Sequence, residues 1–258
     1  MFRINGVALV VGVVLLATPV VVAQPICQIS DGDAVFQINA DGTFDFLPDG
    51  KTDHLAQVGV WTRRLELDNQ EFPASNIVDF SCAGNSAEFL FSEPSFDLLA
   101  SITIVGGPGP GQATLDLSET FTNTDFGTLE MATFTYVDLD MRNTPPDDIA
   151  EFVTSDLMRV TDTVSKDFGE FQINGADAYQ AAEWPELLNL LSDSSADDLD
   201  NSGLPFGPGD FEGAYQVNLS LPENGEATVT GRLAVNVPEP GTLGLLALGM
   251  VAFIRRGR

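Results

Sequence analysis

The sequence is poor in the residues on which most enzyme sites depend. It has one histidine, two cysteines and only 11 lysines and arginines among 258 residues. A zinc site would need a second pair of cysteine or histidine ligands, which the chain lacks. It also lacks a G-x-S-x-G motif, a phosphate-cradling loop and a dinucleotide fingerprint. No motif therefore indicates an enzyme, and His54, in the polar stretch Thr52-Asp53-His54, is expected to be a solvated loop residue.

Basic residues are scarce, whereas acidic residues are abundant. The chain holds 38 aspartates and glutamates, and between its two apolar ends 37 acidic residues stand against seven basic ones, a net charge of −30. Such a surface repels phosphates, which excludes nucleic acid as a partner. It suits a solvated extracellular surface, cation binding or a hydrated matrix.

Long apolar runs occur only at the ends of the chain. At the N-terminus, Arg3 precedes an apolar run over 7–22, and Val21-Val22-Ala23 supplies small residues for cleavage. This order predicts a secretory signal peptide over residues 1–23. An uncleaved anchor is the alternative, although the run is short for a membrane span.

At the C-terminus, Pro238, Glu239 and Pro240 precede an apolar stretch over 243–254, and Arg255, Arg256 and Arg258 close the chain. The stretch is shorter than the roughly 20 residues of a comfortable helical span. The terminal arginines favour the cytoplasmic side, so the body would lie outside the membrane.

This C-terminal arrangement resembles the PEP-CTERM sorting signal in the order and spacing of its parts. The resemblance implies an exported protein whose tail is recognised and removed by an exosortase-type membrane protease. It implies transient inner-membrane anchoring through a C-terminal transmembrane helix, followed by a place at the cell surface, in the outer membrane or outside the cell. Family members come from Gram-negative bacteria that make exopolysaccharide, and they are thought to serve biofilm or floc matrices. A plain C-terminal anchor is the alternative.

The body, residues 24–236, is predicted to be an all-β antiparallel sandwich, followed by the sorting segment 237–258. Apolar and polar residues alternate in several runs, for example at Ala113, Leu115, Leu117 and Phe121, and glycine- and proline-rich turns separate the runs. About ten strands are expected in this way. Alternation also predicts a strand through Met141, and Asp41-Gly42 a tight hairpin.

One short helix is predicted after Pro185, because four apolar side chains follow a helical spacing. They are Trp184, Leu187, Leu188 and Leu191. The apolar stripe should cover an edge or an end of the sandwich.

The body is also similar, over most of its length, to a group of uncharacterised β-rich proteins that carry the same sorting tail. The segments 134–140, 175–180, 198–206 and 208–211 carry this resemblance. It supports the fold and implies no activity.

Export implies an oxidising compartment, so the two cysteines, Cys27 and Cys82, are predicted to form a disulfide. The bond would contribute about 3–4 kcal/mol to stability by closing a long loop.

Two acidic groups are candidates for a structural calcium site. Asp198, Asp200 and Ser202 offer oxygen ligands at alternate positions before Gly203, as at the start of a calcium loop. The bidentate glutamate of an EF-hand is missing, since Gly209 occupies its position. The second group, near the turn at Pro145-Pro146, comprises Asp138, Asp140, Asp147 and Asp148.

Three functions remain open for the body. The first is a non-enzymatic surface or extracellular matrix protein associated with exopolysaccharide, with no cofactor other than structural calcium. The second is a carbohydrate-binding sandwich, with or without calcium, that uses exposed aromatics; the candidates are Trp61, Tyr136, Tyr179 and Tyr215. The third is a glycoside hydrolase with two carboxylates about 5–10 Å apart in a cleft.

Overall fold

The computed structural model describes residues 25–39, 44–109 and 111–237, which form seventeen strands, one α-helix and two short 3₁₀ helices. All strand pairings in its three sheets are antiparallel. The predicted all-β fold with one short α-helix is confirmed. The strand number of about ten was too low, because several strands are only two to five residues long, too short for an alternation of apolar and polar residues to be recognised.

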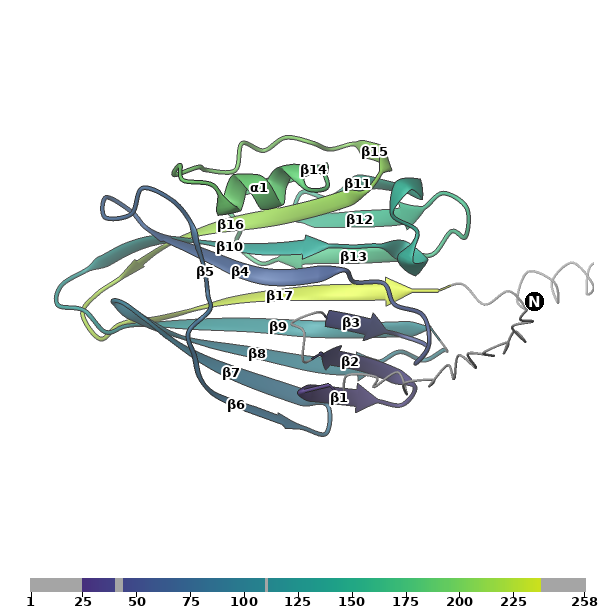
Figure 1. The fold of residues 1–258 in the computed structure, drawn as a ribbon, viewed down its shortest axis with the longest axis horizontal. Helices are drawn as coiled ribbons and strands as arrows, with labels where there is room; N and C mark the ends of the chain where they lie inside the picture. Colours follow the sequence, from purple (N-terminus) through teal and green to yellow (C-terminus); the bar gives the residue numbers. More distant parts are fainter. Residues whose placement is uncertain (1–24, 40–43, 110, 238–258) are drawn as a thin grey trace, which may run out of the picture.

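A nine-stranded sheet forms the back layer in Figure 1. Its strands, in spatial order, are β15 (Phe206–Gly209), β11 (Asp148–Thr154), β12 (Leu157–Asp162), β13 (Phe168–Ile173), β17 (Glu226–Asn236), β9 (Gln112–Asn123), β8 (Phe96–Gly106), β7 (Ser86–Glu93) and β6 (Ile77–Ala83).

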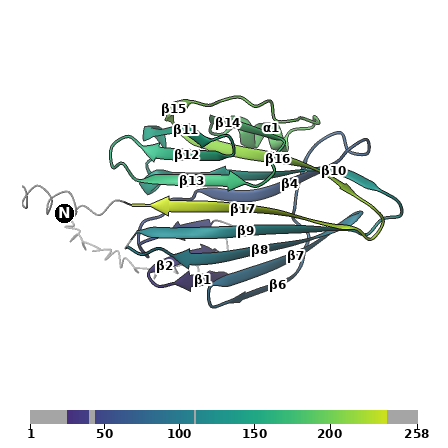
Figure 2. The ribbon, with the colours of Figure 1, turned by 180° about the vertical axis from the view of Figure 1, so that it is seen from behind.

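Two smaller sheets form the front layer (Figure 1). The five-stranded sheet has the order β14 (Ala178–Glu183), β16 (Phe211–Leu221), β10 (Leu129–Asp138), β4 (Gln57–Arg64) and β5 (Phe72–Pro73). The three-stranded sheet contains β1 (Cys27–Asp31), β2 (Ala34–Ile38) and β3 (Phe44–Leu47). Seen from behind in Figure 2, the nine-stranded sheet presents its outer face.

The main core lies between the two layers. Every second residue of β9 is buried, so that Leu115, Leu117 and Phe121 point inward. Met131 and Val137 of β10 belong to the same apolar cluster from the opposite layer. Alternation along the strands therefore gives the sandwich its single main core.

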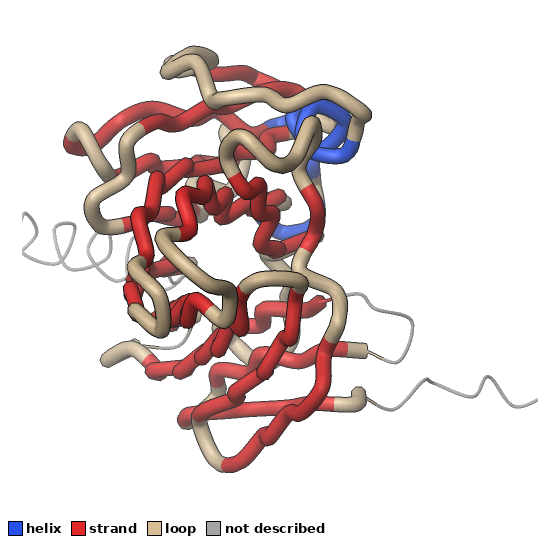
Figure 3. The backbone as a smooth tube through the Cα atoms, turned by 90° about the vertical axis from the view of Figure 1, so that its left-hand side faces the viewer, coloured by secondary structure: helices blue, strands red, loops and turns tan. Residues whose placement is uncertain are grey.

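A second apolar cluster covers the outer face of the five-stranded sheet. Phe134 and Tyr136 of β10 pack there with Trp61, and Leu187 and Leu191 of α1 (Glu186–Ser192) cover them. The helix therefore lies on a sheet face, outside the stacked strands (Figure 3), and the predicted position at an edge or end was wrong. The physical reason is that β10 is buried along almost its whole length, on both faces.

The chain also leaves β10 earlier than the alternation predicted. The strand ends at Asp138, and residues Met141–Asn143 form the 3₁₀ helix η1, followed by η2 (Pro145–Asp147). Met141 is still fully buried, so its apolar position was recognised although its conformation was not. The predicted hairpin at Asp41-Gly42 lies outside the described residues.

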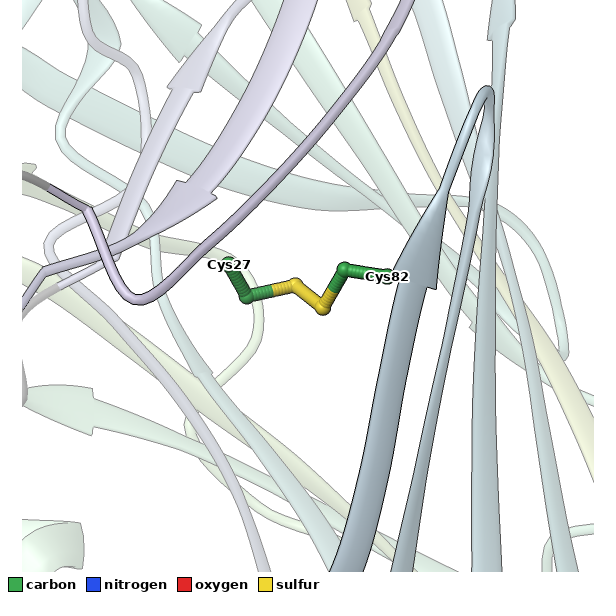
Figure 4. The surroundings of a disulfide bond; sticks show 2 residues. All are labelled: Cys27 and Cys82. Carbon is green, nitrogen blue, oxygen red and sulfur yellow. A yellow bond between two sulfur atoms is a disulfide. The ribbon is translucent and has the colours of Figure 1, made fainter.

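The predicted disulfide is present. Cys27 of β1 and Cys82 of β6 are bonded, with their Cα atoms 5.7 Å apart (Figure 4). The bond joins the three-stranded sheet to the last strand of the nine-stranded sheet, against which β1 also packs. It thereby fixes the start of the body to the edge strand of that sheet.

Within the described ranges, no helix is long and apolar enough to cross a membrane. The predicted signal peptide and the predicted transmembrane helix lie outside those ranges.

Candidate functional site

Three carboxylates meet where β10 ends and β16 begins. Asp138 is the last residue of β10, Asp140 follows two residues later, and Asp210 directly precedes β16. The two strands pair antiparallel, with Asp138 opposite Glu212, so the end of one lies beside the start of the other. One oxygen of each of Asp138, Asp140 and Asp210 lies within 4.8 Å of the other two. Oxygens bound to one calcium ion at about 2.3–2.6 Å are at most about 5 Å apart, so this spacing fits a single hard cation.

Burial makes this cluster unlike an ordinary acidic surface. The Asp138 residue is only 5% exposed, and its Oδ1 has no hydrogen-bond partner within the described part of the chain. The same holds for Oδ1 of Asp140 and of Asp148, the fully buried first residue of β11. The other oxygen of Asp148 accepts the Met141 N–H at 3.2 Å. A buried carboxylate oxygen without a partner is costly unless it is protonated or bound to a cation.

The pKa values of these carboxyl groups are raised, which also indicates that their ionised forms are unfavourable in the fold. Burial raises the pKa of Asp138 to about 8, and the nearby charge of Asp140 acts in the same direction. Burial also raises the pKa of Asp148 to about 8. The pKa of Asp140 rises to about 6, through burial and then through Asp210 and Asp53. A divalent cation at the centre of the cluster would favour the ionised forms and reverse these shifts.

Glu212 lies beside the cluster but is already fully engaged. Its carboxylate accepts the Tyr136 hydroxyl at 2.8 Å, the Leu188 N–H at 3.1 Å and the Leu187 N–H. It thereby satisfies free backbone donors of the first turn of α1. Burial and neighbouring carboxylates raise the pKa of the Tyr136 hydroxyl. This network attaches α1 to the sheet next to the acidic cluster.

The loop after Asp140 is held by side chains at the end of β12 and just before β13. Arg142 forms an ion pair with Asp167, and the Thr144 hydroxyl donates to Asp162 Oδ2 at 2.8 Å. Arg142 itself has a positive φ of 60°. These contacts fix the loop next to Asp140, and they thereby help to keep the three carboxylates close together in the folded protein.

The prediction that His54 is a solvated loop residue was wrong, because the side chain is fully buried. Its Nδ1 accepts the Arg142 N–H at 3.1 Å, which places the ring under the loop. Burial lowers the pKa of His54 to about 4, so the imidazole is neutral at neutral pH. The neighbouring Asp53 accepts N–H groups from Phe46 at 2.8 Å and from His54 at 2.9 Å. The polar sequence around His54 therefore reflects side chains that bind backbone groups inside the fold.

The first predicted calcium group, Asp198, Asp200 and Ser202, has a different environment. Asp198 forms an ion pair with Arg63 and accepts the Gln216 Nε2–H at 2.9 Å, so a cationic side chain already neutralises it. The Ser202 backbone carbonyl accepts the Ala181 N–H at 3.1 Å, and Ser202 and Asp200 are both exposed. Within the described ranges, no group of three acidic, histidine or cysteine side chains includes Asp198 or Asp200. Calcium at this loop remains a prediction.

The second predicted group is partly brought together. Asp138 and Asp140 share the cluster, and Asp148 lies near enough to affect the pKa of Asp138. Asp147 is not part of the group of three. Asp210, which completes it, was missed, since its proximity follows from the pairing of β10 with β16 and cannot be read from sequence spacing.

The aromatic residues proposed for sugar binding are mostly inside. Trp61, Tyr136 and Tyr215 are at most 5% exposed, and Tyr179 is half-buried. Trp61 packs edge-on against Tyr136 with ring centroids 5.4 Å apart. The three buried side chains therefore pack in the interior of the fold and do not form an exposed aromatic surface.

Comparison with known families concerns the C-terminus. Residues 236–258 match the PEP-CTERM protein-sorting motif, which includes Pro238, Glu239, Pro240 and the three terminal arginines. The chain is therefore an exported protein of the exosortase-sorted kind. No curated protein matches it. The sorting residues themselves lie outside the described residues.

Comparison with solved structures concerns the body. A bacterial glucoamylase in complex with acarbose is similar with a TM-score of 0.57 and 10% identity, over 88% of this chain and 34% of the glucoamylase chain. A protein from Escherichia coli K12, described provisionally as an aldose 1-epimerase, is similar with a TM-score of 0.50 and 11% identity, over 82% of this chain and 99% of that one. The chain thus spans about a third of the length of the glucoamylase chain. At these identities the likeness shows the fold alone.

Proposed function

We propose that the body is a non-enzymatic matrix protein that holds one divalent cation, calcium by its ligand chemistry, at Asp138, Asp140 and Asp210. After export and sorting it would act among exopolysaccharide at the cell surface or outside the cell. The observation that carries this proposal is the approach of three carboxylate oxygens to within 4.8 Å of one another, one of them from the buried Asp138.

The electrostatics of the cluster support a cation. Three carboxylates at this distance repel one another when ionised, and the pKa values of Asp138 and Asp140 are raised as a result of burial and this repulsion. A bound divalent ion would supply the missing partners of the two Oδ1 atoms. Carboxylate oxygens are the ligands that calcium prefers, and extracellular calcium modules bind with dissociation constants of about 10⁻⁴–10⁻³ M.

The charge of the whole chain, −27 at pH 7, determines how the body would associate with an acidic matrix. Many acidic matrix polymers carry the same sign of charge, so direct attraction between them and this surface is absent. A bound divalent cation lowers that repulsion and can bridge carboxylates of protein and polymer. Association with an acidic polysaccharide should therefore depend on calcium.

A carbohydrate-binding sandwich is the second candidate, and a polar trough on the outer face of the nine-stranded sheet favours it. The trough has a volume of about 510 Å³ and crosses β8, β9, β17 and β13. Ser101, Asp116, Asn174 and Arg232 offer hydrogen-bonding groups there, and Arg232 Nε donates to Asp116 at 2.9 Å. This surface would bind sugar through polar contacts instead of aromatic stacking.

Binding to immobilised alginate, an acidic polysaccharide, tests the proposal. The secreted protein is applied with excess CaCl₂ or with EDTA, beside the variants Asp140→Asn and Asp200→Asn. We expect retention only with calcium, its loss in Asp140→Asn, and its persistence in Asp200→Asn, which removes the same charge from an exposed site. Equal retention in EDTA and in Asp140→Asn would contradict the proposal. Loss of retention in Arg232→Ala alone would favour the polar trough.

A further inference from the structure

A second site, unrelated to the acidic cluster, lies inside the sandwich. A cavity of about 340 Å³ lies between β4 and the three-stranded sheet on one side and β7, β8 and β9 on the other. Its walls are almost entirely apolar and include Ile38, Phe44, Val58, Phe89, Ile102 and Leu117. Cavities of this size and character are typical of sites for small ligands.

One carboxylate, that of Glu119, lines this apolar cavity. In β9 it takes a position in the inward-facing series that also contains Leu115, Leu117 and Phe121. Strand geometry therefore directs its side chain to the interior, where an apolar residue would be expected. The sequence contained this signal, because a glutamate interrupts a regular apolar alternation.

The contacts of Glu119 leave half of its carboxylate unused. The residue is 4% exposed, and its Oε1 accepts the Thr135 hydroxyl at 3.0 Å. Its Oε2 is buried and has no hydrogen-bond partner in the described part of the chain. Burial raises the pKa of Glu119 to about 7. An unpaired buried acid destabilises a core, so its presence calls for a partner that the described residues do not provide.

We propose that this cavity binds a small amphipathic amine, whose apolar body lies against the cavity walls and whose amino group pairs with Glu119. The walls supply the contacts for an alkyl chain or ring, and Glu119 Oε2 supplies an acceptor for one charged donor. The charge of −27 on the chain favours a cationic ligand over an anionic one. Charge-assisted hydrogen bonds of this type are roughly twice as strong as neutral ones, so the amine would account for most of the specificity.

Calorimetric titration with decylamine, decanol and decanoate tests the site on the secreted protein. Three proteins are compared: the wild type and the variants Glu119→Gln and Glu88→Gln. Glu88 is an exposed glutamate between the inward-facing Ala87 and Phe89 of β7. Its variant therefore removes the same charge from the outside of the sheet and serves as the matched control.

We expect decylamine to bind once per chain, decanol, which has no charge to pair with Glu119, to bind more weakly, and decanoate not to bind. Glu119→Gln should weaken decylamine binding about 10- to 100-fold, because one hydrogen bond to a charged group is lost, whereas Glu88→Gln should leave it unchanged. The proposal is overturned if decylamine binds with many equivalents, if decanoate binds as tightly, or if both variants bind alike. The comparison of the three ligands on the wild-type protein decides the matter even if Glu119→Gln fails to fold.

Discussion

Replacing Asp138 with asparagine separates two effects on the unfolding free energy: the cost of burying an ionised carboxylate, and the stabilisation that a bound calcium ion would give. The folded state binds the Asp138 proton more tightly than the unfolded chain does, because its pKa rises from 3.8 to about 8. Its contribution to stability is therefore fully present below the unfolded pKa and is lost as the pH rises through about 8. For this residue the loss amounts to about 6 kcal/mol.

The asparagine variant does not ionise, so it escapes this loss. An asparagine amide without a full set of partners costs about 1–3 kcal/mol, which leaves a net gain of about 3–5 kcal/mol in unfolding free energy near pH 9 without calcium. Calcium should instead favour the wild-type protein over the variant. At a concentration of about 100 times its dissociation constant it stabilises the wild-type protein by about 2.7 kcal/mol, and the variant, which lacks a ligand, should gain little.

Urea unfolding monitored by tryptophan fluorescence measures both effects. The experiment compares the wild type and Asp138→Asn near pH 6 and near pH 9, in EDTA and in excess CaCl₂. If the variant is less stable than the wild type in EDTA at both pH values, the Asp138 carboxylate has a favourable partner in the folded state, and the reasoning is refuted. Equal stabilisation of both proteins by calcium would place the ion elsewhere.

Three further predictions concern other parts of the molecule. Cys82→Ser should lower the unfolding free energy by about 4 kcal/mol, because the bond to Cys27 closes a loop with a sequence separation of 55, and denaturant unfolding would show it. Arg63→Met should cost about 3–5 kcal/mol in the same assay, since it leaves the buried carboxylate of Glu71 without its ion pair at 2.6 Å. The mature secreted protein should lack Arg258, and an intact mass that still includes the arginine cluster would contradict removal of the sorting tail.

The sandwich could be predicted because the signals that indicate it lie within short stretches of sequence. Alternation in β9 follows directly from burial of one face, and the cysteine pair follows from export. The helix was found from the spacing of Leu187, Leu188 and Leu191. The position of the helix could not be predicted. Because β10 is buried on both faces, its sequence shows no separate apolar pattern for the outer face that the helix covers.

The candidate site could be predicted only in part, because it depends on strand pairing. Asp138 and Asp140 are close in sequence and were recognised, whereas Asp210 joins them through the pairing of β10 with β16. His54 was placed at the surface because polar neighbours usually indicate exposure. In the fold, the Asp53 carboxylate accepts backbone N–H groups inside the protein.

Calorimetric titration of CaCl₂ into the calcium-free protein tests the proposed cation centre most directly. One ion should bind per chain, with a dissociation constant of about 10⁻⁴–10⁻³ M. Asp140→Asn should abolish this binding, and Asp200→Asn, in the other predicted group, should leave it intact. Absence of binding to the wild-type protein, or binding that is lost in Asp200→Asn but kept in Asp140→Asn, would contradict a centre built from Asp138, Asp140 and Asp210.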